Sequence, residues 1–132
     1  MPTLAQKKAN PRSTYWLDKA DREITRIYRA KQCLICGAHN PQPHHMICKS
    51  RCAYHRHTLE NIIPLCSTHH TFGNDISAHS KSVLVVERFV EHIRTHHPEV
   101  YHWAQEHQYD TIENGFKPNY LARYEELKEI DA

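Results

Sequence analysis

The stretch NIIPLCSTHH at residues 61–70 defines the centre of the fold. Its apolar start, with two adjacent isoleucines, predicts a short strand. The residues after it predict a short helix that ends near Gly73. Cys66 and His69 have the Cys-x-x-His spacing of half a zinc site. Because neighbouring helix residues point about 100° apart, we expect His69 and His70 to face different surroundings.

A matching half-site precedes this stretch, in the form Cys33-x-x-Cys36-Gly. Two thiolates around a tight turn can occupy adjacent corners of a tetrahedron. A redox CxxC motif has the same spacing, but such a motif occurs within a thioredoxin-like βαβ pattern, which the sequence lacks. Cys48 and Cys52 are alternative ligands, but we interpret them as free thiols. If either were a ligand, it would take the place of His69. The sequence therefore predicts a closed structural zinc site formed by Cys33, Cys36, Cys66 and His69.

The composition favours metal over disulfides as the stabilising element. The chain has 132 residues, a mean hydropathy of −0.75 and 39% hydrophobic residues, which leaves little apolar surface to bury. Its five cysteines are an odd number, and the N-terminus has no apolar signal segment. With no long apolar run, we expect a soluble cytoplasmic protein without a membrane partner. A formal charge of +2 permits nucleic-acid binding without requiring it.

Helices are expected on both sides of the central stretch. We divide the chain into a flexible basic tail at 1–12, an N-terminal helix plus core at 13–79, and a C-terminal helical extension packed on the core at 80–132. Helical spacing in the first helix is carried by Trp16, Ala20, Ile24, Ile27 and Tyr28. In the extension the apolar face contains Leu84, Val85, Phe89 and Ile93, and Pro98 ends that helix. The fold class is therefore α+β.

Between the two half-sites lies PHHMICKSR at 43–51, and Asn61 and His70 follow. Here the sequence resembles the HNH endonucleases, whose core has a histidine in the first strand, an asparagine before the second strand and a histidine on the next helix. The corresponding residues are His45, Asn61 and His70. The resemblance covers about residues 33–70 and implies a small ββα-metal core with a zinc knuckle. NIIPLCSTHH is similar to the family pattern NLxPLCxxCH, with His69 where the family has a second zinc-binding cysteine.

The resemblance also implies roles for these residues. His45 would be the general base, with an ordinary pKa of about 6.5 that suits catalysis near neutral pH. His44 and His70 would hold a catalytic divalent cation, which we expect to be Mg²⁺, Mn²⁺, Ni²⁺ or Zn²⁺, with imidazole ligands favouring the transition metals. Asn61 would tie the strands together and help orient the base; the alternative is an ordinary turn asparagine.

Basic residues follow the first strand and suggest contact with DNA. The loop gathers Lys49, Arg51, His55, Arg56 and His57 near the proposed site. Of these, Lys49, Arg51, Arg56 and His57 would bind DNA phosphates, which positions a substrate without reading its sequence. A solvated loop is the alternative. His79 could reach the cation, but we favour helix capping or exposure. His92 and His96 have chelating spacing without an evident third partner, and His107 receives no role.

The leading hypothesis is a metal-dependent HNH endonuclease that hydrolyses DNA phosphodiester bonds. Its small size resembles stand-alone phage and prophage HNH proteins, which implies DNA processing or recombination, with a phage or recombination protein as a possible partner. One alternative is a non-catalytic zinc-finger module that binds DNA or protein. Another is a helper subunit of a larger nuclease complex. The sequence leaves the oligomeric state open.

Overall fold

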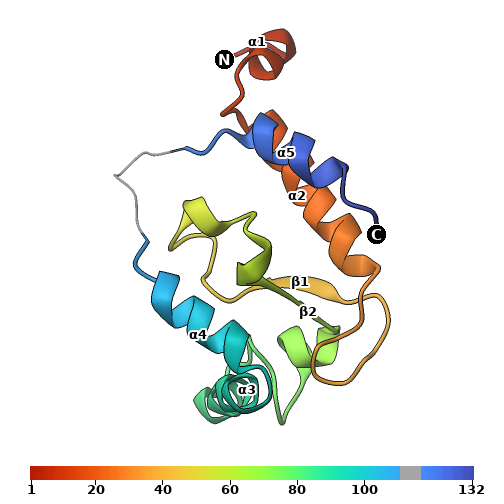
Figure 1. Cartoon of the computed structure of the whole chain (residues 1–132), viewed down its shortest axis with the longest axis vertical. Helices are drawn as coiled ribbons and strands as arrows, with labels where there is room; N and C mark the ends of the chain where they lie inside the picture. The colour runs from red at the N-terminus through yellow and green to blue at the C-terminus, as the bar shows by residue number, and fades with distance from the viewer. Residues whose placement is uncertain (111–116) are drawn as a thin grey trace.

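A computed structural model of the chain describes residues 1–110 and 117–132. It has mixed helices and one small antiparallel sheet, which agrees with the α+β class. Figure 1 shows the sheet between two helical groups, with α2 and α5 on one side and α3 and α4 on the other. In chain order the elements are α1 (Leu4–Ala9), α2 (Thr14–Arg29), β1 (Gln42–His45), η1 (Ala53–His55), η2 (Leu59–Asn61), β2 (Ile62–Leu65), η3 (Thr68–Phe72), α3 (Val83–His96), α4 (Pro98–His107) and α5 (Tyr120–Lys128).

The two strands form a short antiparallel pair that carries the predicted site residues. His44 lies opposite Ile63, and His45 lies opposite Ile62. Pro43 faces Pro64, so neither residue donates to the ladder at this position; a two-stranded sheet has only edge strands and tolerates this loss. Strand β2 is the buried one of the pair, with Ile62, Ile63 and Leu65 in the interior. Strand β1 thus carries the histidines of the sheet, and β2 contributes apolar side chains to the core.

Helix α2 covers one side of the sheet through its predicted apolar face. Ala20, Ile24, Ile27 and Tyr28 are buried, and Trp16 is half-buried. Their core also includes Ile62 of β2 and Leu127 of α5. The Arg26 guanidinium donates to the carbonyl oxygens of Leu127 and Ile130, at 3.2 and 2.9 Å. These contacts anchor the C-terminal helix along α2.

Helix α3 covers the other part of β2. Its buried residues Val85, Phe89 and Ile93 follow the predicted face, and the last two pack with Ile63 and Leu65. The prediction for Leu84 is wrong, because that side chain is 55% exposed at the first turn of the helix. As expected, α3 ends before Pro98, which then begins α4.

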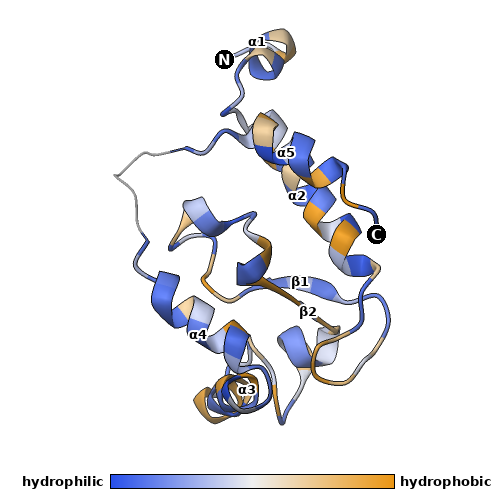
Figure 2. Ribbon diagram, in the orientation of Figure 1, coloured by the Kyte–Doolittle hydropathy of each residue, from blue (hydrophilic) through white to orange (hydrophobic). Residues whose placement is uncertain are grey.

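The hydropathy colouring follows this division. Figure 2 shows hydrophobic colour along β2 and on parts of α2, whereas much of α4 and the loops is hydrophilic.

The N-terminal segment differs from the expected tail, because Leu4–Ala9 forms a short helix with a Thr3–Gln6 capping box. That helix buries no residue, so local capping rather than packing accounts for it. Among the described helices, none is long and apolar enough to cross a membrane.

Candidate metal centres

The Cys33–Gly37 segment folds as a tight turn that brings two thiols together. The Gly37 N–H donates to the Cys33 carbonyl at 2.8 Å, and the Cys33 N–H donates to the Ala38 carbonyl at 2.9 Å. Gly37 has φ +76°, in the left-handed region where an added Cβ would be strained. The glycine after Cys36 therefore allows the chain to reverse.

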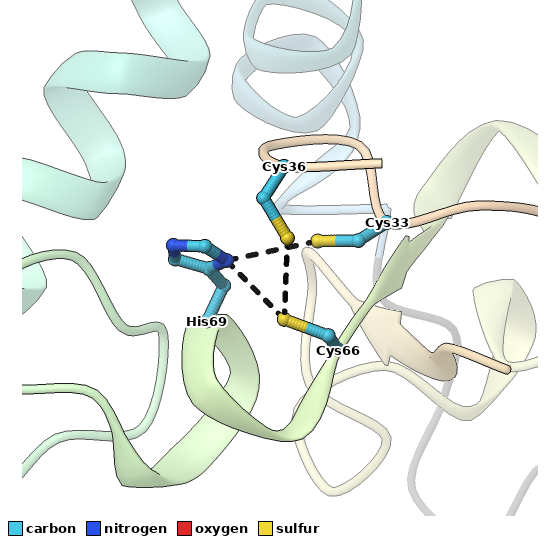
Figure 3. A group of neighbouring side chains, drawn as sticks. All are labelled: Cys33, Cys36, Cys66 and His69. Atoms are coloured by element: carbon cyan, nitrogen blue, oxygen red, sulfur yellow. Dashed lines mark hydrogen bonds between the residues drawn. The ribbon is translucent and has the colours of Figure 1, made fainter. Parts of the chain in front are cut away.

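The four residues of the predicted zinc knuckle meet at one point, and their ligand atoms lie within 4.8 Å of one another. Figure 3 shows the three thiols and the His69 ring directed toward each other. Sγ of Cys36 and Cys66 are 3.7 Å apart, and Nδ1 of His69 lies 3.3 Å from Sγ of Cys66 and 3.8 Å from Sγ of Cys33. Tetrahedral zinc with sulfur at about 2.3 Å and nitrogen at about 2.0 Å holds its ligands about 3.5–3.8 Å apart. The cluster can therefore hold a metal such as zinc.

The electrostatics of the knuckle favour a thiolate at Cys33, whereas burial raises the pKa of Cys66. Burial raises the pKa of Cys33, but hydrogen bonds from the backbone N–H groups of Cys66, Cys36 and Ile35, together with the His69 ring, lower that pKa to about 6. All five cysteines are free thiols. Cys48 and Cys52 lie outside the knuckle: Cys48 is exposed, and Cys52 is buried and donates to the Asp110 carbonyl. Neither replaces His69, in agreement with the interpretation from spacing.

A second cluster contains three histidines. His44 of β1, His70 of η3 and His79 of the following loop place their ligand nitrogens within 4.8 Å of one another. The ring centroids are 4.9 to 5.2 Å apart. The sequence predicted His44 and His70 as partners. It favoured capping or exposure for His79, and the structure leaves His79 exposed as expected and also places its ring beside the other two.

His44 is the buried member of this three-histidine cluster. Its side chain also meets the Phe89 ring edge-on, with 5.6 Å between centroids. The Nδ1 atom is buried and has no hydrogen-bond partner among the described residues. Burial, and then the neighbouring rings of His70 and His79, lower the pKa of His44 to about 3, so the ring is neutral at neutral pH. A buried imidazole nitrogen without a partner loses its hydration, and coordination to a cation would compensate for this loss.

Gln42 orients His70 within the cluster. The Nδ1–H of His70 donates to Oε1 of Gln42 at 2.7 Å. A neutral imidazole that donates from Nδ1 carries its lone pair on Nε2. Gln42 stands two residues before His44, on the same side of the strand. Sequence reasoning missed Gln42, although this period-two spacing could have identified it.

Backbone pairing places His79 beside the other two rings. The N–H groups of Ala78 and His79 donate to the carbonyl oxygens of His69 and His70, both at 2.9 Å. These bonds hold the loop after Gly73 against η3. Because the pairing joins η3 to a loop without regular structure, no periodic pattern in the sequence indicates it.

His45 points to a different neighbour from His44. Its Nε2–H donates to the carbonyl oxygen of Arg56 at 2.8 Å. A carbonyl only accepts, so Nε2 carries the proton and Nδ1 carries the lone pair of the neutral ring. Burial lowers the pKa of His45 to about 4, although the bond to the carbonyl opposes this shift. At neutral pH the ring is therefore uncharged with a free lone pair on Nδ1, but its pKa lies below the value of about 6.5 expected from the sequence, so His45 is a weaker base than expected.

Asn61 is fully buried and ties together the segments around His45. Its Oδ1 accepts from the Ile47 N–H at 2.7 Å, and its Nδ2 donates to the carbonyl oxygens of Ile47 and His55, both at 3.1 Å. The amide thus uses both ends to join the exit of β1 to the loop that contains Arg56. This network matches the tying role expected of Asn61, while its effect on catalysis stays a prediction.

The predicted DNA-binding residues divide into two pairs. Arg56 and His57 both bind Asp21 of α2: the guanidinium makes two bonds, at 3.0 and 2.6 Å, and His57 Nε2 lies at 2.8 Å. The His57 side chain is only 2% exposed. Burial excludes His57 from phosphate contact, so the prediction is wrong for that residue. The Arg56 side chain is 23% exposed beside Asp21, and its contact with DNA stays a prediction. Lys49 and Arg51 are exposed and stay candidates.

Asp21 is the charged centre of this contact. Burial raises its pKa, but hydrogen bonds from His57 and Arg56 and the Arg56 charge lower the pKa from the usual 3.8 to about 2. The carboxylate therefore stays ionised across the neutral range. Because the Arg56 carbonyl holds His45, Asp21 supports the position of that ring from helix α2.

His69 and His70 separate as the helical spacing predicted, with His69 in the knuckle and His70 in the three-histidine cluster. No protein-family model, curated protein or solved structure matches the chain. The HNH resemblance therefore stays a prediction, and the geometry of the described residues is the basis for a function.

Proposed function

We propose that this protein is a metal-dependent endonuclease of the HNH type that hydrolyses DNA phosphodiester bonds. The observation that carries the proposal is the convergence of His44, His70 and His79 next to His45 in the chain. A non-catalytic zinc module needs the knuckle but has no use for a second cluster of imidazoles. It also does not need a neighbouring histidine with a free nitrogen lone pair.

The donor set of the three-histidine cluster fits a transition-metal ion. Imidazole nitrogens suit Mn²⁺, Ni²⁺, Zn²⁺ and related ions better than Mg²⁺, which prefers oxygen. Three protein ligands leave a coordination position open, as in catalytic rather than structural sites. When bound, the cation would stabilise negative charge on the phosphate and the leaving oxygen. His44 and His70 would be ligands as expected, and His79 would complete the set.

His45 would serve as the general base. Its Nδ1 would take a proton from the attacking water, while its Nε2–H stays bonded to the Arg56 carbonyl. That carbonyl would also stabilise the positive charge that the ring gains. Asn61 would keep the loop in place through Ile47 and His55. General-base catalysis of this kind contributes about 10² to 10⁴ in rate.

DNA would approach along the loop that leaves β1. Lys49 and Arg51 are exposed there, a few residues after the two histidines. The Arg51 guanidinium lies over the Tyr109 ring, 5.3 Å from its centroid, which holds part of the loop against the end of α4. Phosphate contacts from such residues would position the backbone without reading bases.

The test is cleavage of supercoiled plasmid by zinc-loaded protein, with Mg²⁺, Mn²⁺ or Ni²⁺ supplied in turn. We expect nicking or linearisation by wild type, with Mn²⁺ or Ni²⁺ at least as effective as Mg²⁺. His45→Ala should lose at least about 100-fold in rate. His102→Ala is the matched control, because that histidine is exposed on α4 away from both clusters.

Two outcomes would count against the proposal. A folded, zinc-loaded wild type that cleaves neither duplex nor single-stranded DNA with any of these cations would favour a binding module or a helper subunit. Equal cleavage by His45→Ala and wild type would remove His45 as the base. Zinc content and circular dichroism, measured on each variant, separate lost chemistry from lost folding.

A further inference from the structure

A third group of metal-binding side chains lies outside both centres described above. His55 ends η1, His107 ends α4, and Asp110 follows shortly after that helix; their ligand atoms lie within 4.8 Å of one another. His55 Nε2 and His107 Nδ1 both face the same carboxylate oxygen, Oδ2 of Asp110, at 3.0 and 2.5 Å. Two segments far apart in the sequence therefore direct nitrogen and oxygen donors at one place.

We propose that His55, His107 and Asp110 bind a divalent transition-metal ion at a site separate from the knuckle and the three-histidine cluster. Two imidazoles and a carboxylate suit Zn²⁺, Co²⁺ or Ni²⁺ and do not suit Ca²⁺ or Mg²⁺, which prefer sets of oxygen ligands. Three protein donors leave at least one position for water. This inference does not depend on the nuclease proposal.

The surroundings hold both rings in orientations suited to coordination. His55 Nδ1 lies 3.1 Å from Oγ1 of Thr58, the kind of second contact that orients metal-binding imidazoles. The Trp103 ring stacks on His107 at 4.4 Å and meets His55 edge-on at 4.9 Å. The histidines are thus limited in rotation before any ion binds.

Coordination requires a free lone pair on each imidazole. In the structure each imidazole can donate its N–H to the Asp110 carboxylate. With an ion bound, the His55 proton would lie on Nδ1, where Thr58 Oγ1 can accept it. The His107 proton would lie on Nε2. The freed lone pairs and the Asp110 oxygen would then meet the cation.

The site is accessible from one side. The His55 side chain is only 6% exposed, whereas those of His107 and Asp110 are 35% and 42% exposed. An ion can therefore enter from the Asp110 side. Once bound, it would tie the loop of His55 to the end of α4. The same loop receives the Asn61 amide bond and contains Arg56, so this tie would restrain the support of His45.

Cobalt binding tests the site. Protein with zinc in the knuckle and the His79→Ala substitution would be titrated with Co²⁺ and followed by calorimetry and visible absorption. We expect one equivalent of Co²⁺, with d–d bands and without thiolate charge-transfer bands. Adding His107→Ala should weaken that binding at least about tenfold, because even the loss of a second contact to a metal ligand costs about 10- to 100-fold. The His79→Ala/His102→Ala protein is the matched control on the same helix.

Unchanged Co²⁺ affinity and stoichiometry in the His79→Ala/His107→Ala protein would overturn the proposal. If that protein also melted at a lower temperature, the three residues would form a hydrogen-bonded contact that stabilises the fold and not a metal site. Asp110→Asn provides a second variant, in case His107→Ala fails to fold. It keeps the size of the side chain but removes its charge, and it should weaken Co²⁺ binding in the same direction.

Discussion

The zinc knuckle and the three-histidine cluster stand next to each other on η3, yet they differ in donor type and in how their donors are satisfied. In the knuckle, three thiols and one ring meet one another, and backbone N–H groups bond to Cys33. In the cluster, only imidazoles meet, and the buried Nδ1 of His44 has no partner among the residues that the structure describes. The first arrangement suits a structural metal site in which protein ligands fill every coordination position. The second suits a site that leaves a position free for water or a phosphate oxygen.

The adjacent pair His69 and His70 makes this comparison testable with single substitutions. The two residues share a helical turn, so a substitution at either position affects the same local backbone. Differences between the two variants should therefore report on the two sites.

The largest effect is expected for His69→Ala. This substitution removes the one nitrogen ligand of the knuckle, and structural zinc contributes directly to folding free energy. We expect loss of bound zinc and loss of the cooperative melting transition, measured by metal analysis and circular dichroism. His69→Cys should restore both, because a thiolate is an equivalent zinc ligand. A His69→Ala protein that keeps its zinc would show that Cys48 or Cys52 can supply a ligand.

His70→Ala is expected to reduce the rate of cleavage and not the stability of the fold. The protein should keep its zinc and melt within a few degrees of wild type, because the ring is only half-buried. Plasmid cleavage should fall at least about 100-fold, since His70 is a proposed ligand of the catalytic cation. If His70→Ala loses zinc as readily as His69→Ala, then the two centres are not separate.

A smaller effect is expected for Asp21→Asn, which tests the support of His45 from α2. Loss of the carboxylate leaves Arg56 and His57 partly buried without their anion, so we expect a loss of about 1–3 kcal/mol in the free energy of unfolding, measured by urea titration. Cleavage should fall with it. Asp18→Asn, at an exposed position of the same helix, is the matched control.

The pH dependence of the Asp21 effect has a defined sign. The pKa of Asp21 is lowered from 3.8 to about 2 in the folded protein. Its stabilising contribution is therefore complete above about pH 5 and is lost as pH falls through 3.8 toward 2. The stability difference between wild type and Asp21→Asn should be the same at pH 7 and pH 8.5. A difference that changes over this range would mean that another group titrates with the contact.

The smallest effect is expected for Gly37→Ala in the knuckle turn. No atom lies within 4 Å of the added Cβ, so the cost is the left-handed backbone alone, about 1 kcal/mol. Gly37→Asn should cost less, because asparagine tolerates this conformation better. Thermal melting of zinc-loaded proteins measures both. A cost several times larger would mean that the turn must move to hold the metal.

Sequence patterns were sufficient where the signal is local. Helix α2 follows from the spacing of Ala20, Ile24 and Ile27, because burial on one face of a helix repeats every three or four residues. The knuckle follows from two short motifs whose ligands are close in sequence within each half. The separation of His69 and His70 follows from the angle between helix neighbours.

Contacts between irregular segments were beyond these patterns. His79 joins the three-histidine cluster through backbone bonds to His69 and His70, which no spacing rule indicates. His57 is of a residue type that contacts DNA, yet it is bound in the interior by Asp21, from a helix far away in the sequence. A basic side chain in a loop has the same local signature whether it meets solvent or a buried carboxylate.

The sequence by itself indicated α2, β2, η3 and α3 and the four residues that meet in the knuckle, because each depends on local spacing and on the chemistry of single residue types. The candidate base came from the resemblance to a family and not from spacing. Only the tertiary structure decided which histidines share a centre, which charges are already paired, and that His55, His107 and Asp110 meet. Those outcomes depend on how the chain closes its loops, and loop closure is set by the packing of α2, α3 and α4 around β2, which no short segment encodes.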